Sequence, residues 1–368
     1  MEKSFIPYVN LGAQSKNHKQ ELMDSVSKVI DSGNYILGNE VKEFEKEFSN
    51  YCGTTHSIGV ANGTCALHLS LKSLGIGAGD EVITAPNSFI ASASSIALTG
   101  ARPVFADIRP DLNIDPVKIE AAVTSRTKAI IPVHLTGRPA QMDAILSIAK
   151  KHSLAVIEDC AQAVGAKWKN KRVGSMGDVG CFSLHPLKNL YAFGDAGMVV
   201  AKDLNFTERL TKARSHGFKN RTECDFWSFN CRLDEMQAAM LRVQLCKLDE
   251  WTETRRQLAF FYNENLKKYV VVPEEQSNEY CVYQTYMIRA DRRDSLSDYL
   301  IQNGVDVKIH YPIPIHMQKA AESLGHKAGD FPETMKAAGD ILSLPLYPGL
   351  KKSQQERIVE TIRNFYAS

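Results

Sequence analysis

A serine, a histidine and a lysine follow one another at the end of an apolar run in the middle of the chain. Residues 179–184 are apolar enough for a buried strand, and Ser183, His185 and Lys188 fall at its end. A lysine beside so much apolar sequence is unusual, because lysines are rarely buried without a partner. Partial desolvation lowers the pKa of an amine and allows it to form a Schiff base with an aldehyde. Most lysines at strand ends are solvated loop residues, so this stretch alone leaves both interpretations open.

Other expected strand ends carry groups that would complement such a lysine. Gly63 and Thr64 open a predicted helix, whose first N–H groups and dipole could bind a phosphate or could simply be capped. Asp159 ends an apolar run, where a carboxylate needs a cationic partner, and Gln162 follows one helical turn later. Phe89 could place its ring over a flat ligand, although such a residue is more often part of a core.

Together, a phosphate-binding helix start, an aromatic ring, a carboxylate and a lysine are the groups needed to hold pyridoxal phosphate. The carboxylate would keep the ring nitrogen protonated, and the lysine would hold the aldehyde and move protons. The GIGAGD segment (75–80) follows a helix and precedes a strand, the reverse of a dinucleotide-binding loop, so it predicts a turn. His134 has either a site or a structural role. The sequence contains no HExxH motif and no His/Cys cluster of the kind that binds a catalytic metal ion.

Seven short apolar runs alternate with helical patterns over the first two hundred residues, which predicts an α/β protein with a mostly parallel sheet covered on both faces. The expected strands are 56–61, 81–85, 103–107, 129–134, 154–159, 179–184 and 198–201. The expected helices are 17–32, 40–51, 64–74, 88–98, 116–123 and 140–152.

The alternation stops near residue 202, and a different pattern follows. Helices are expected at 205–215 and at 233–267, the second long enough to join two domains. A smaller α+β region then contains a strand (280–290), a helix (293–303), a strand (305–310) and two final helices. We therefore expect a large domain over 1–250 and a small C-terminal domain over 251–368.

Composition narrows the class of protein. The 368 residues are 44% hydrophobic and carry a net charge of +2, so nothing indicates binding to nucleic acid or to a membrane. Eight cysteines form no CxxC pair and are typical of reduced core thiols. No apolar signal-peptide core follows Met1-Glu2-Lys3. These features predict a cytoplasmic protein.

Many motifs in one order give the chain a specific resemblance. They are GNYILGNEVKEFEKEF (33–48), VANGTCALHLSL (60–71), PNSFIASASSI (86–96), PVHLTGRPAQMD (132–143), IEDCAQAVGA (157–166), FSLHPLKNL (182–190), FNCRLDEMQAA (229–239) and YPIPIH (311–316). With these motifs the chain resembles the sugar aminotransferases of the DegT/DnrJ/EryC1/StrS family. The resemblance implies the fold-type-I, aspartate aminotransferase-like architecture and the cofactor pyridoxal 5'-phosphate.

The resemblance also implies roles for individual residues. Lys188 is the Schiff-base lysine and acid/base; Asp159 pairs with the pyridine nitrogen, Gln162 contacts the ring hydroxyl, and Phe89 stacks on the ring. Gly63, Thr64 and Ser183 hold the phosphate, and Asn230 reaches the phosphate of the other subunit in a homodimer with shared sites. His185, Tyr311 and His316 are expected near the substrate.

By the same resemblance, L-glutamate donates an amino group that is then passed to a ketosugar, usually nucleotide-linked, for an amino sugar of lipopolysaccharide or another surface glycan. Many family members have Gly-Glu-Gly-Gly where this chain has residues 194–197, GDAG. An aspartate at this position (Asp195) resembles the subgroup that acts on 3-ketosugars. Ala196, in place of glycine, is a further departure from the family motif, so both 3-keto and 4-keto substrates stay open.

Alternatives remain within and outside this family. The substrate could be a nucleotide-free keto sugar acid or a cyclitol. A sugar dehydratase of the same family would have His in place of Lys188. An amino-acid lyase would need an arginine for the α-carboxylate, and none is evident in the sequence. A non-catalytic regulator would not need the set Lys188, Asp159 and Gln162.

Overall fold

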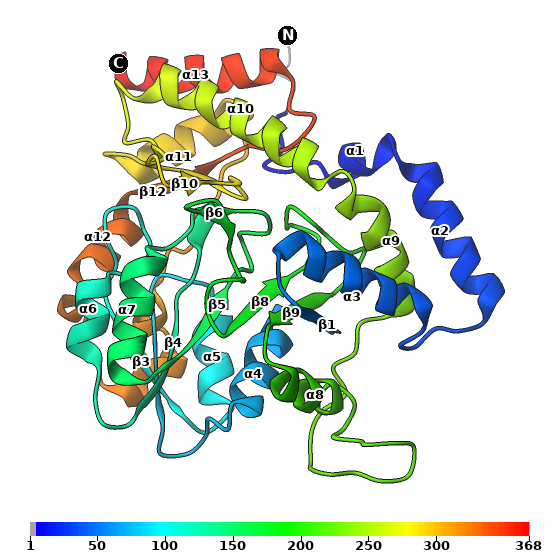
Figure 1. The fold of residues 1–368 in the computed structure, drawn as a ribbon. Coiled ribbons are helices and arrows are strands. Elements are labelled where there is room, and N and C mark those ends of the chain that lie inside the picture. The colour runs from blue at the N-terminus through cyan, green and yellow to red at the C-terminus, as the bar shows by residue number, and fades with distance from the viewer. Residues whose placement is uncertain (1–4, 368) are drawn as a thin grey trace.

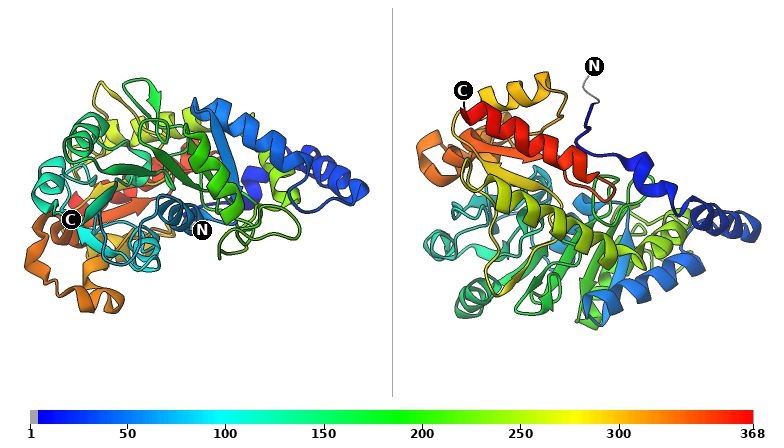
Figure 2. Two further views of the ribbon diagram at one scale, coloured as in Figure 1. Left: turned by 60° about the horizontal axis from the view of Figure 1, so that its bottom comes forward. Right: turned by 90° about the horizontal axis from the view of Figure 1, so that it is seen from above.

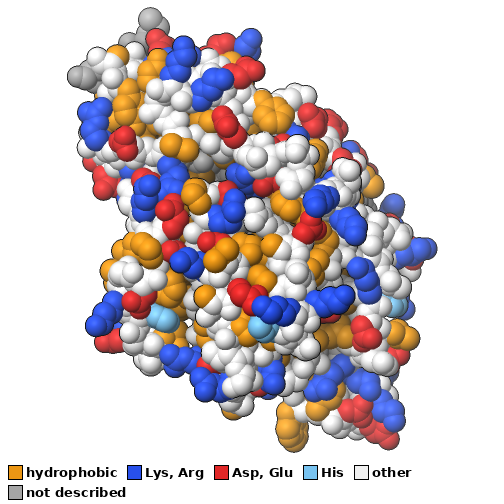
Figure 3. Space-filling view, turned by 60° about the vertical axis from the view of Figure 1, so that its left-hand side comes forward, with side chains coloured by type: hydrophobic (Ala, Val, Ile, Leu, Met, Phe, Trp, Pro, Cys, Tyr) orange, Lys and Arg blue, Asp and Glu red, His pale blue; other side chains and the backbone are white. Residues whose placement is uncertain are grey.

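The computed structural model describes residues 5–367. The expectation about a signal peptide concerns residues 1–3, which lie outside this range. Among the described residues, no helix is both long and apolar enough to cross a membrane. Lysine and arginine side chains intermingle with aspartate and glutamate on the face shown in Figure 3, rather than forming a continuous basic band.

A seven-stranded sheet forms the centre of the molecule (Figure 1), in the order β1-β9-β8-β5-β4-β2-β3. Its strands are β1 (His56–Val60), β2 (Glu81–Thr84), β3 (Arg102–Phe105), β4 (Thr127–Ile131), β5 (Ala155–Asp159), β8 (Val179–Ser183) and β9 (Gly197–Ala201). Only β9 is antiparallel to its neighbours β1 and β8; the other pairs are parallel. The predicted α/β class and all seven strands are confirmed.

Alternating side chains of the central strands enter two different cores, as the period of two in a strand requires. Phe182 and Met198 pack beneath α3 (Asn39–Cys52) and α9 (Glu235–Leu245), on the same face as α6 (Pro116–Ala122) and α7 (Met142–His152). Cys181 and Val199 face the opposite core, which contains α4 (Gly63–Ser73), α5 (Ala91–Ala97) and α8 (Leu204–Ala213). Covering both faces explains why these strands are apolar throughout.

The last third of the chain builds a separate hydrophobic cluster. It combines α10 (Leu248–Leu266), α11 (Arg293–Gln302) and α13 (Lys352–Ala367) with the antiparallel pair β11 (Tyr286–Arg289) and β12 (Ile341–Leu344). Figure 2 shows α10 and α13 side by side. Ile6 completes this cluster and pairs with Val305. The boundary at residue 250 stays a prediction.

Three expected elements of this region differ in the structure. The helix predicted at 233–267 is two helices, because α9 ends and α10 begins around Cys246–Lys247. The strand predicted at 280–290 exists only as β10 (Glu279–Tyr280) and β11. The predicted strand at 305–310 is an irregular segment with two isolated bridges, at Val305 and Lys308. In each case tertiary contacts override a local pattern.

Shorter elements complete the described chain. Before the sheet lie α1 (Leu11–Lys16) and α2 (Lys19–Ser32), and α12 (Pro332–Asp340) precedes β12. A small sheet joins β6 (Lys167–Trp168) and β7 (Lys171–Arg172) to β10. The segment 75–80 is a turn, in which the N–H of Gly77 donates to the Asp80 carboxylate at 2.9 Å. The prediction of a turn there is confirmed.

A buried carboxylate joins two of the covering helices. Glu235, at the start of α9, accepts hydrogen bonds from the N–H groups of Gly38 (2.8 Å), Glu40 (2.6 Å) and Val41 (3.3 Å). These groups lie at the N-terminus of α3, where backbone donors have no partner within the helix and the dipole favours negative charge. Glu235 therefore caps a helix almost two hundred residues away in sequence.

Replacing this cap should destabilise the protein. Glu235→Ala leaves three backbone donors without their acceptor, and we expect the free energy of unfolding to fall by about 2 kcal/mol. Urea unfolding followed by circular dichroism measures this change. Glu264→Ala, which removes an exposed carboxylate from α10, is the control and should change little. Equal stability of the two variants would contradict the capping role.

Candidate active site

A cavity of about 440 Å³ lies at the carboxyl ends of the parallel strands, where open α/β sheets bind ligands. Strands β5 and β8, the start of α4 and the loop after β2 contribute lining residues, and Gln284, Thr285, His310 and Tyr311 line it as well. The lining includes most of the residues singled out in the sequence, namely Gly63, Thr64, Phe89, Asp159, Gln162, Ser183, His185, Lys188, Asp195 and Tyr311. The structure thus gathers side chains from segments that are far apart in sequence.

Lys188 lies in the turn after β8, where its N–H donates to the carbonyl of His185 at 2.8 Å. Burial lowers the pKa of the Lys188 amine to about 8, and the negative charge of Asp159 opposes that shift. A much larger share of this amine is therefore neutral near neutral pH than for an exposed lysine. A neutral amine is the form that attacks an aldehyde.

Asp159 lies at the end of β5 and is almost fully buried. Its Oδ2 accepts from the Ser92 hydroxyl at 2.8 Å and its Oδ1 from the N–H of Ala161 at 3.1 Å. Both donors are neutral, and burial raises the pKa of the Asp159 carboxyl despite these bonds and the nearby Lys188. A buried carboxylate held by neutral donors fits a cationic ligand group, such as a protonated ring nitrogen.

Gln162 points its amide N–H groups into the cavity because its oxygen is already bound. The N–H of Thr136 donates to Gln162 Oε1 at 2.7 Å, which leaves Nε2 3.4 Å from the Tyr311 hydroxyl. The ring of Phe89 lies 5.6 Å from that of Tyr311, centroid to centroid, and 54% of Phe89 is exposed. Phe89 is thus a cavity-wall residue rather than a core residue.

The start of α4 closely approaches the end of β8. Asn62 caps α4 by accepting from the N–H of Cys65 at 2.8 Å, so Gly63 and Thr64 begin the helix with N–H groups that have no partner within it. A Cβ on Gly63 would lie 2.7 Å from the Cβ of Ser183. The helix start, with its N–H groups, therefore lies beside Ser183, and Gly63, Thr64 and Ser183 all line the cavity, an arrangement that suits a phosphate.

Several residues of the cavity have no assigned role in the sequence motifs. His310 lines the wall with its Nδ1 3.0 Å from the Ser343 hydroxyl, and burial together with Lys188 lowers its pKa to about 4. Thr285, Gln284 and Ser92 also line the cavity. His310 directly precedes the motif that begins at Tyr311, and Ser92 lies inside the motif at 86–96; Thr285 and Gln284 are brought to the cavity by tertiary packing.

Two of the predicted site residues lie outside this cavity. Asn230 is exposed on the surface, where its backbone pairs with Ser215. His316 is buried with its ring 4.8 Å from that of Phe331, and neither ring nitrogen has a hydrogen-bond partner among the described residues. The roles expected for both stay predictions.

His134 belongs to a buried network behind the cavity. Its Nδ1 accepts from the N–H of Ala140 at 2.9 Å, so the proton must be on Nε2, which lies 3.0 Å from Glu158 Oε2. Glu158 also accepts from the N–H groups of Gly174, Met176 and Gly177. Although His134, Glu158 and Cys160 could approach one metal ion, both ring nitrogens and the carboxylate are already engaged. This geometry favours the structural role.

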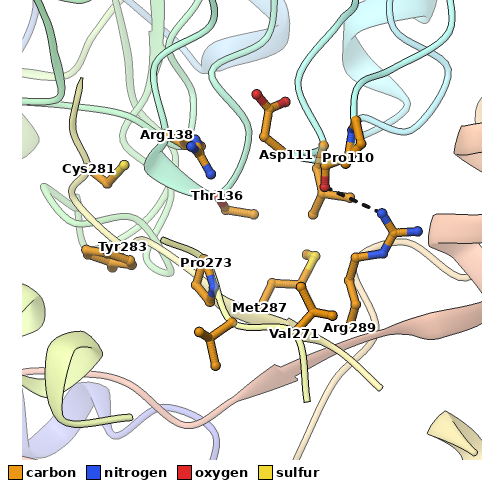
Figure 4. A pocket seen from close by; sticks show the side chains of 12 residues that line it. Pro110, Asp111, Thr136, Arg138, Val271, Pro273, Cys281, Tyr283, Met287 and Arg289 are labelled. Carbon is orange, nitrogen blue, oxygen red and sulfur yellow. Dashed lines mark hydrogen bonds between the residues drawn. The ribbon is translucent and has the colours of Figure 1, made fainter. Parts of the chain in front are cut away.

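A second cavity, of about 70 Å³, lies between residues 110–112, Thr136 and Arg138 on one side and the segment 271–289 on the other (Figure 4). Its charged side chains already have partners: Arg138 pairs with Glu279, and Arg289 pairs with Asp340 and donates to the carbonyl of Pro110. Lys188 and Asp159 do not line it. The cavity that contains Lys188 and Asp159 is therefore the candidate active site.

The residues of the cavity around Lys188 and Asp159 fit pyridoxal phosphate. They offer a lysine with a lowered pKa, a buried carboxylate without a cationic hydrogen-bond partner, and a helix start that only glycine allows to lie against Ser183. The fold and this site define an enzyme of the fold-type-I pyridoxal-phosphate class.

Comparison with known proteins gives the family. Residues 16–363 match the model of the DegT/DnrJ/EryC1/StrS aminotransferase family, and the chain belongs to this family of pyridoxal-phosphate enzymes. It is 46% identical to a pleiotropic regulatory protein of Geobacillus stearothermophilus, over 98% of both chains. It is 41% identical to dTDP-3-amino-3,6-dideoxy-alpha-D-galactopyranose transaminase of Aneurinibacillus thermoaerophilus, over 98% of this chain and 99% of the relative.

A solved structure agrees with this assignment. The crystal structure of S. venezuelae DesV in complex with a ketimine intermediate superposes with a TM-score of 0.97 at 39% identity, covering 99% of each chain. The predicted family and fold-type-I architecture are confirmed.

The lowered pKa of Lys188 predicts a pH dependence. Because only the neutral amine attacks the aldehyde, the rate at which pyridoxal phosphate joins the apoprotein should rise with pH and level off above about 8. Stopped-flow absorbance measures the rate, and borohydride reduction with peptide mapping identifies the modified lysine. Lys188→Ala is the control. A rate that keeps rising toward the pKa of an ordinary lysine would contradict the shift.

The close contact at Gly63 predicts a second effect. Gly63→Ala places a methyl group against Ser183 and forces the helix start away from β8, so we expect the affinity for pyridoxal phosphate to fall by about tenfold. Equilibrium dialysis of the apoprotein measures it. Gly339→Ala, where a new Cβ meets nothing within 4 Å, is the control. Unchanged affinity of Gly63→Ala would remove Gly63 from the phosphate site.

Proposed function

We propose that the protein transfers the amino group of L-glutamate to a nucleotide-linked 3-ketosugar. The observation that carries this proposal is the Lys188 amine, with its lowered pKa, beside the buried Asp159 at the base of a cavity of about 440 Å³. A cavity of this size is large enough for a small ligand such as a sugar above the cofactor. When bound, pyridoxal phosphate carries the amino group between the two substrates and withdraws electrons from the carbon that loses its proton.

The residues of the chain divide the work of holding the cofactor. The Gly63 and Thr64 N–H groups and the Ser183 hydroxyl would bind its phosphate, and Asp159 would pair with its ring nitrogen. Gln162 would donate to the ring hydroxyl through the amide that Thr136 orients. Phe89 would cover one face of the ring. These assignments agree with the positions of the side chains around the cavity.

Lys188 would also move the proton in both half-reactions. In its neutral form Nζ accepts the proton from the α-carbon of glutamate, and in its charged form it returns a proton to the carbon that receives the amino group. A pKa near working pH serves both directions, because neither form of the amine is scarce. His310, whose lowered pKa keeps it neutral, adds no second positive charge to the wall of the cavity.

The position of Asp195 supports a 3-ketosugar. Asp195 lines the cavity in the turn before β9, and its carboxylate is one methylene shorter than the glutamate common at this position in the family. The 41%-identical relative is named as a 3-amino sugar transaminase. A keto sugar acid or cyclitol is the alternative substrate. Use of the sugar in lipopolysaccharide or another surface glycan, and a cytoplasmic location, stay predictions.

The 46%-identical relative is named as a regulatory protein, so a second candidate function is that of a non-catalytic regulator. A regulator would have no need for a lysine whose pKa is lowered by burial or for a buried carboxylate without a cationic hydrogen-bond partner. Lys188, in place of histidine, likewise argues against a sugar dehydratase.

A second copy of the chain would complete the site. The loop that carries Asn230 also exposes Trp227 by 97% and Phe229 by 54%, which is unusual for side chains that face only water. Burial of these aromatic side chains against a partner would bring Asn230 to the partner's phosphate site. We therefore propose a homodimer with shared active sites.

A two-step assay tests the reaction. Glutamate alone should shift the visible absorbance of the holoenzyme into the ultraviolet, and a dTDP- or UDP-linked 3-ketosugar should then restore it and yield a 3-amino sugar detectable by mass spectrometry. The matching 4-ketosugars and a free keto sugar acid are the controls. A response to the 4-ketosugar alone would overturn the regiochemistry, and a protein that binds no cofactor would favour the regulator.

Mixed dimers test the shared site. Lys188→Ala and Asn230→Ala should each be inactive or weak alone, but their hybrid contains one site in which Lys188 and the opposite Asn230 are both intact. Mixing the two under exchange conditions should therefore restore activity. Differently tagged subunits confirm that hybrids form. Confirmed hybrids without restored activity would contradict sharing of Asn230.

A further inference from the structure

Ser92 is a cavity residue to which none of the roles above has been given. It lies in the first turn of α5, is buried, and lines the cavity beside Asp159. Its hydroxyl donates to Asp159 Oδ2 at 2.8 Å. This bond joins two segments 67 residues apart in sequence.

The hydrogen bond from Ser92 fixes the position of one oxygen of the Asp159 carboxylate, Oδ2. The other oxygen, Oδ1, accepts from the N–H of Ala161 at 3.1 Å. Ala161 lies two residues after the end of β5. Two donors on two oxygens set the plane of the carboxyl group, because each oxygen is held by a different part of the fold. Ser92 is the one of these donors that a point substitution can remove, since the other is a backbone group.

We infer that Ser92 is a positioning residue that orients the Asp159 carboxylate toward the ring nitrogen of pyridoxal phosphate and favours its ionised form. This inference rests on the pairing of Asp159 with that nitrogen, proposed above. A hydroxyl facing an ionised carboxylate can only donate, so the bond is strongest when Asp159 is charged. In a buried site such a bond is worth more than in water.

Two consequences follow for the bound cofactor. Without the Ser92 hydroxyl, Asp159 loses one of its two hydrogen-bond donors, and its charged form becomes less favourable. Its hold on the ring nitrogen weakens, and so does the electron withdrawal that depends on a protonated ring. Cofactor affinity and the pH response of its absorbance should therefore change together.

Ser95 provides a matched control on the same helix. It is fully buried, lies one turn along from Ser92, and its hydroxyl donates to the carbonyl of Ser92 at 3.2 Å. It does not line the cavity. Ser95→Ala therefore makes the same chemical change in α5 at equal burial, without touching Asp159.

The experiment compares Ser92→Ala, Ser92→Thr and Ser95→Ala with the unmodified protein. For Ser92→Ala we expect the dissociation constant for pyridoxal phosphate to rise by about tenfold. We also expect the pH midpoint of the bound cofactor's absorbance change to move to higher pH. Ser92→Thr, which keeps the hydroxyl, and Ser95→Ala should stay close to the unmodified protein in both. Thermal unfolding of the apoproteins shows whether each variant is folded.

Each outcome bears on the inference. If Ser92→Ala binds the cofactor with unchanged affinity and an unchanged pH midpoint, Ser92 does not act through Asp159. If Ser95→Ala gives the same changes, the effect is a general loosening of α5 and the inference also fails. If Ser92→Ala does not fold, the threonine variant decides: loss of both properties in folded Ser92→Thr would overturn the role of the hydroxyl.

Asp159→Asn separates this inference from the proposed function. If that variant loses cofactor affinity while Ser92→Ala does not, the ring-nitrogen assignment stands and only the role of Ser92 is wrong. If Asp159→Asn binds pyridoxal phosphate like the unmodified protein, the assignment of Asp159 itself fails.

Discussion

Burial of an amine and a carboxylate at one edge of a sheet is the constraint on which the rest of the site depends. Asp159 ends β5, and Lys188 lies in the turn after β8, which is the parallel neighbour of β5. The sheet itself therefore brings the two residues together. Each group is unfavourable to bury alone: desolvation lowers the pKa of the amine and raises that of the acid. The fold accepts this cost where a ligand can supply the missing partner.

Two glycines near this pair of residues allow the start of α4 to lie close to the ends of the strands. Gly63 lies against Ser183, and Gly197 lies against the backbone of Asn62, where a Cβ would be 2.5 Å from the carbonyl. The start of α4 is thereby held against β8 and β9 at once. The N–H groups at a helix N-terminus can bind an anion only if they point toward it. These contacts fix the direction in which the N-terminus of α4 points.

Much of this could be read from the sequence, and the reasons are physical. Long apolar runs predicted the seven strands, because strands covered on both faces cannot alternate in polarity. Lys188, Asp159 and Gly63 were visible because each stands where an apolar run ends. The contact of Ser92 with Asp159 and the place of Thr285 in the cavity cannot be read from the sequence, since a serine or threonine in a helical or irregular stretch has no distinctive pattern until tertiary packing directs its hydroxyl. The split between α9 and α10 was missed because both helices have continuous periodicity.

The pairing of Ile6 with Val305 bears on how the chain matures on the ribosome. The segment around Ile6 is synthesised before the hydrophobic cluster that receives it, because that cluster is built from residues 259–365. The sheet can assemble during translation from contacts between nearby segments, whereas the segment around Ile6 must wait until Val305 and its neighbours have been made. This contact therefore cannot form until the later region of the chain exists, unlike the contacts between nearby segments of the sheet.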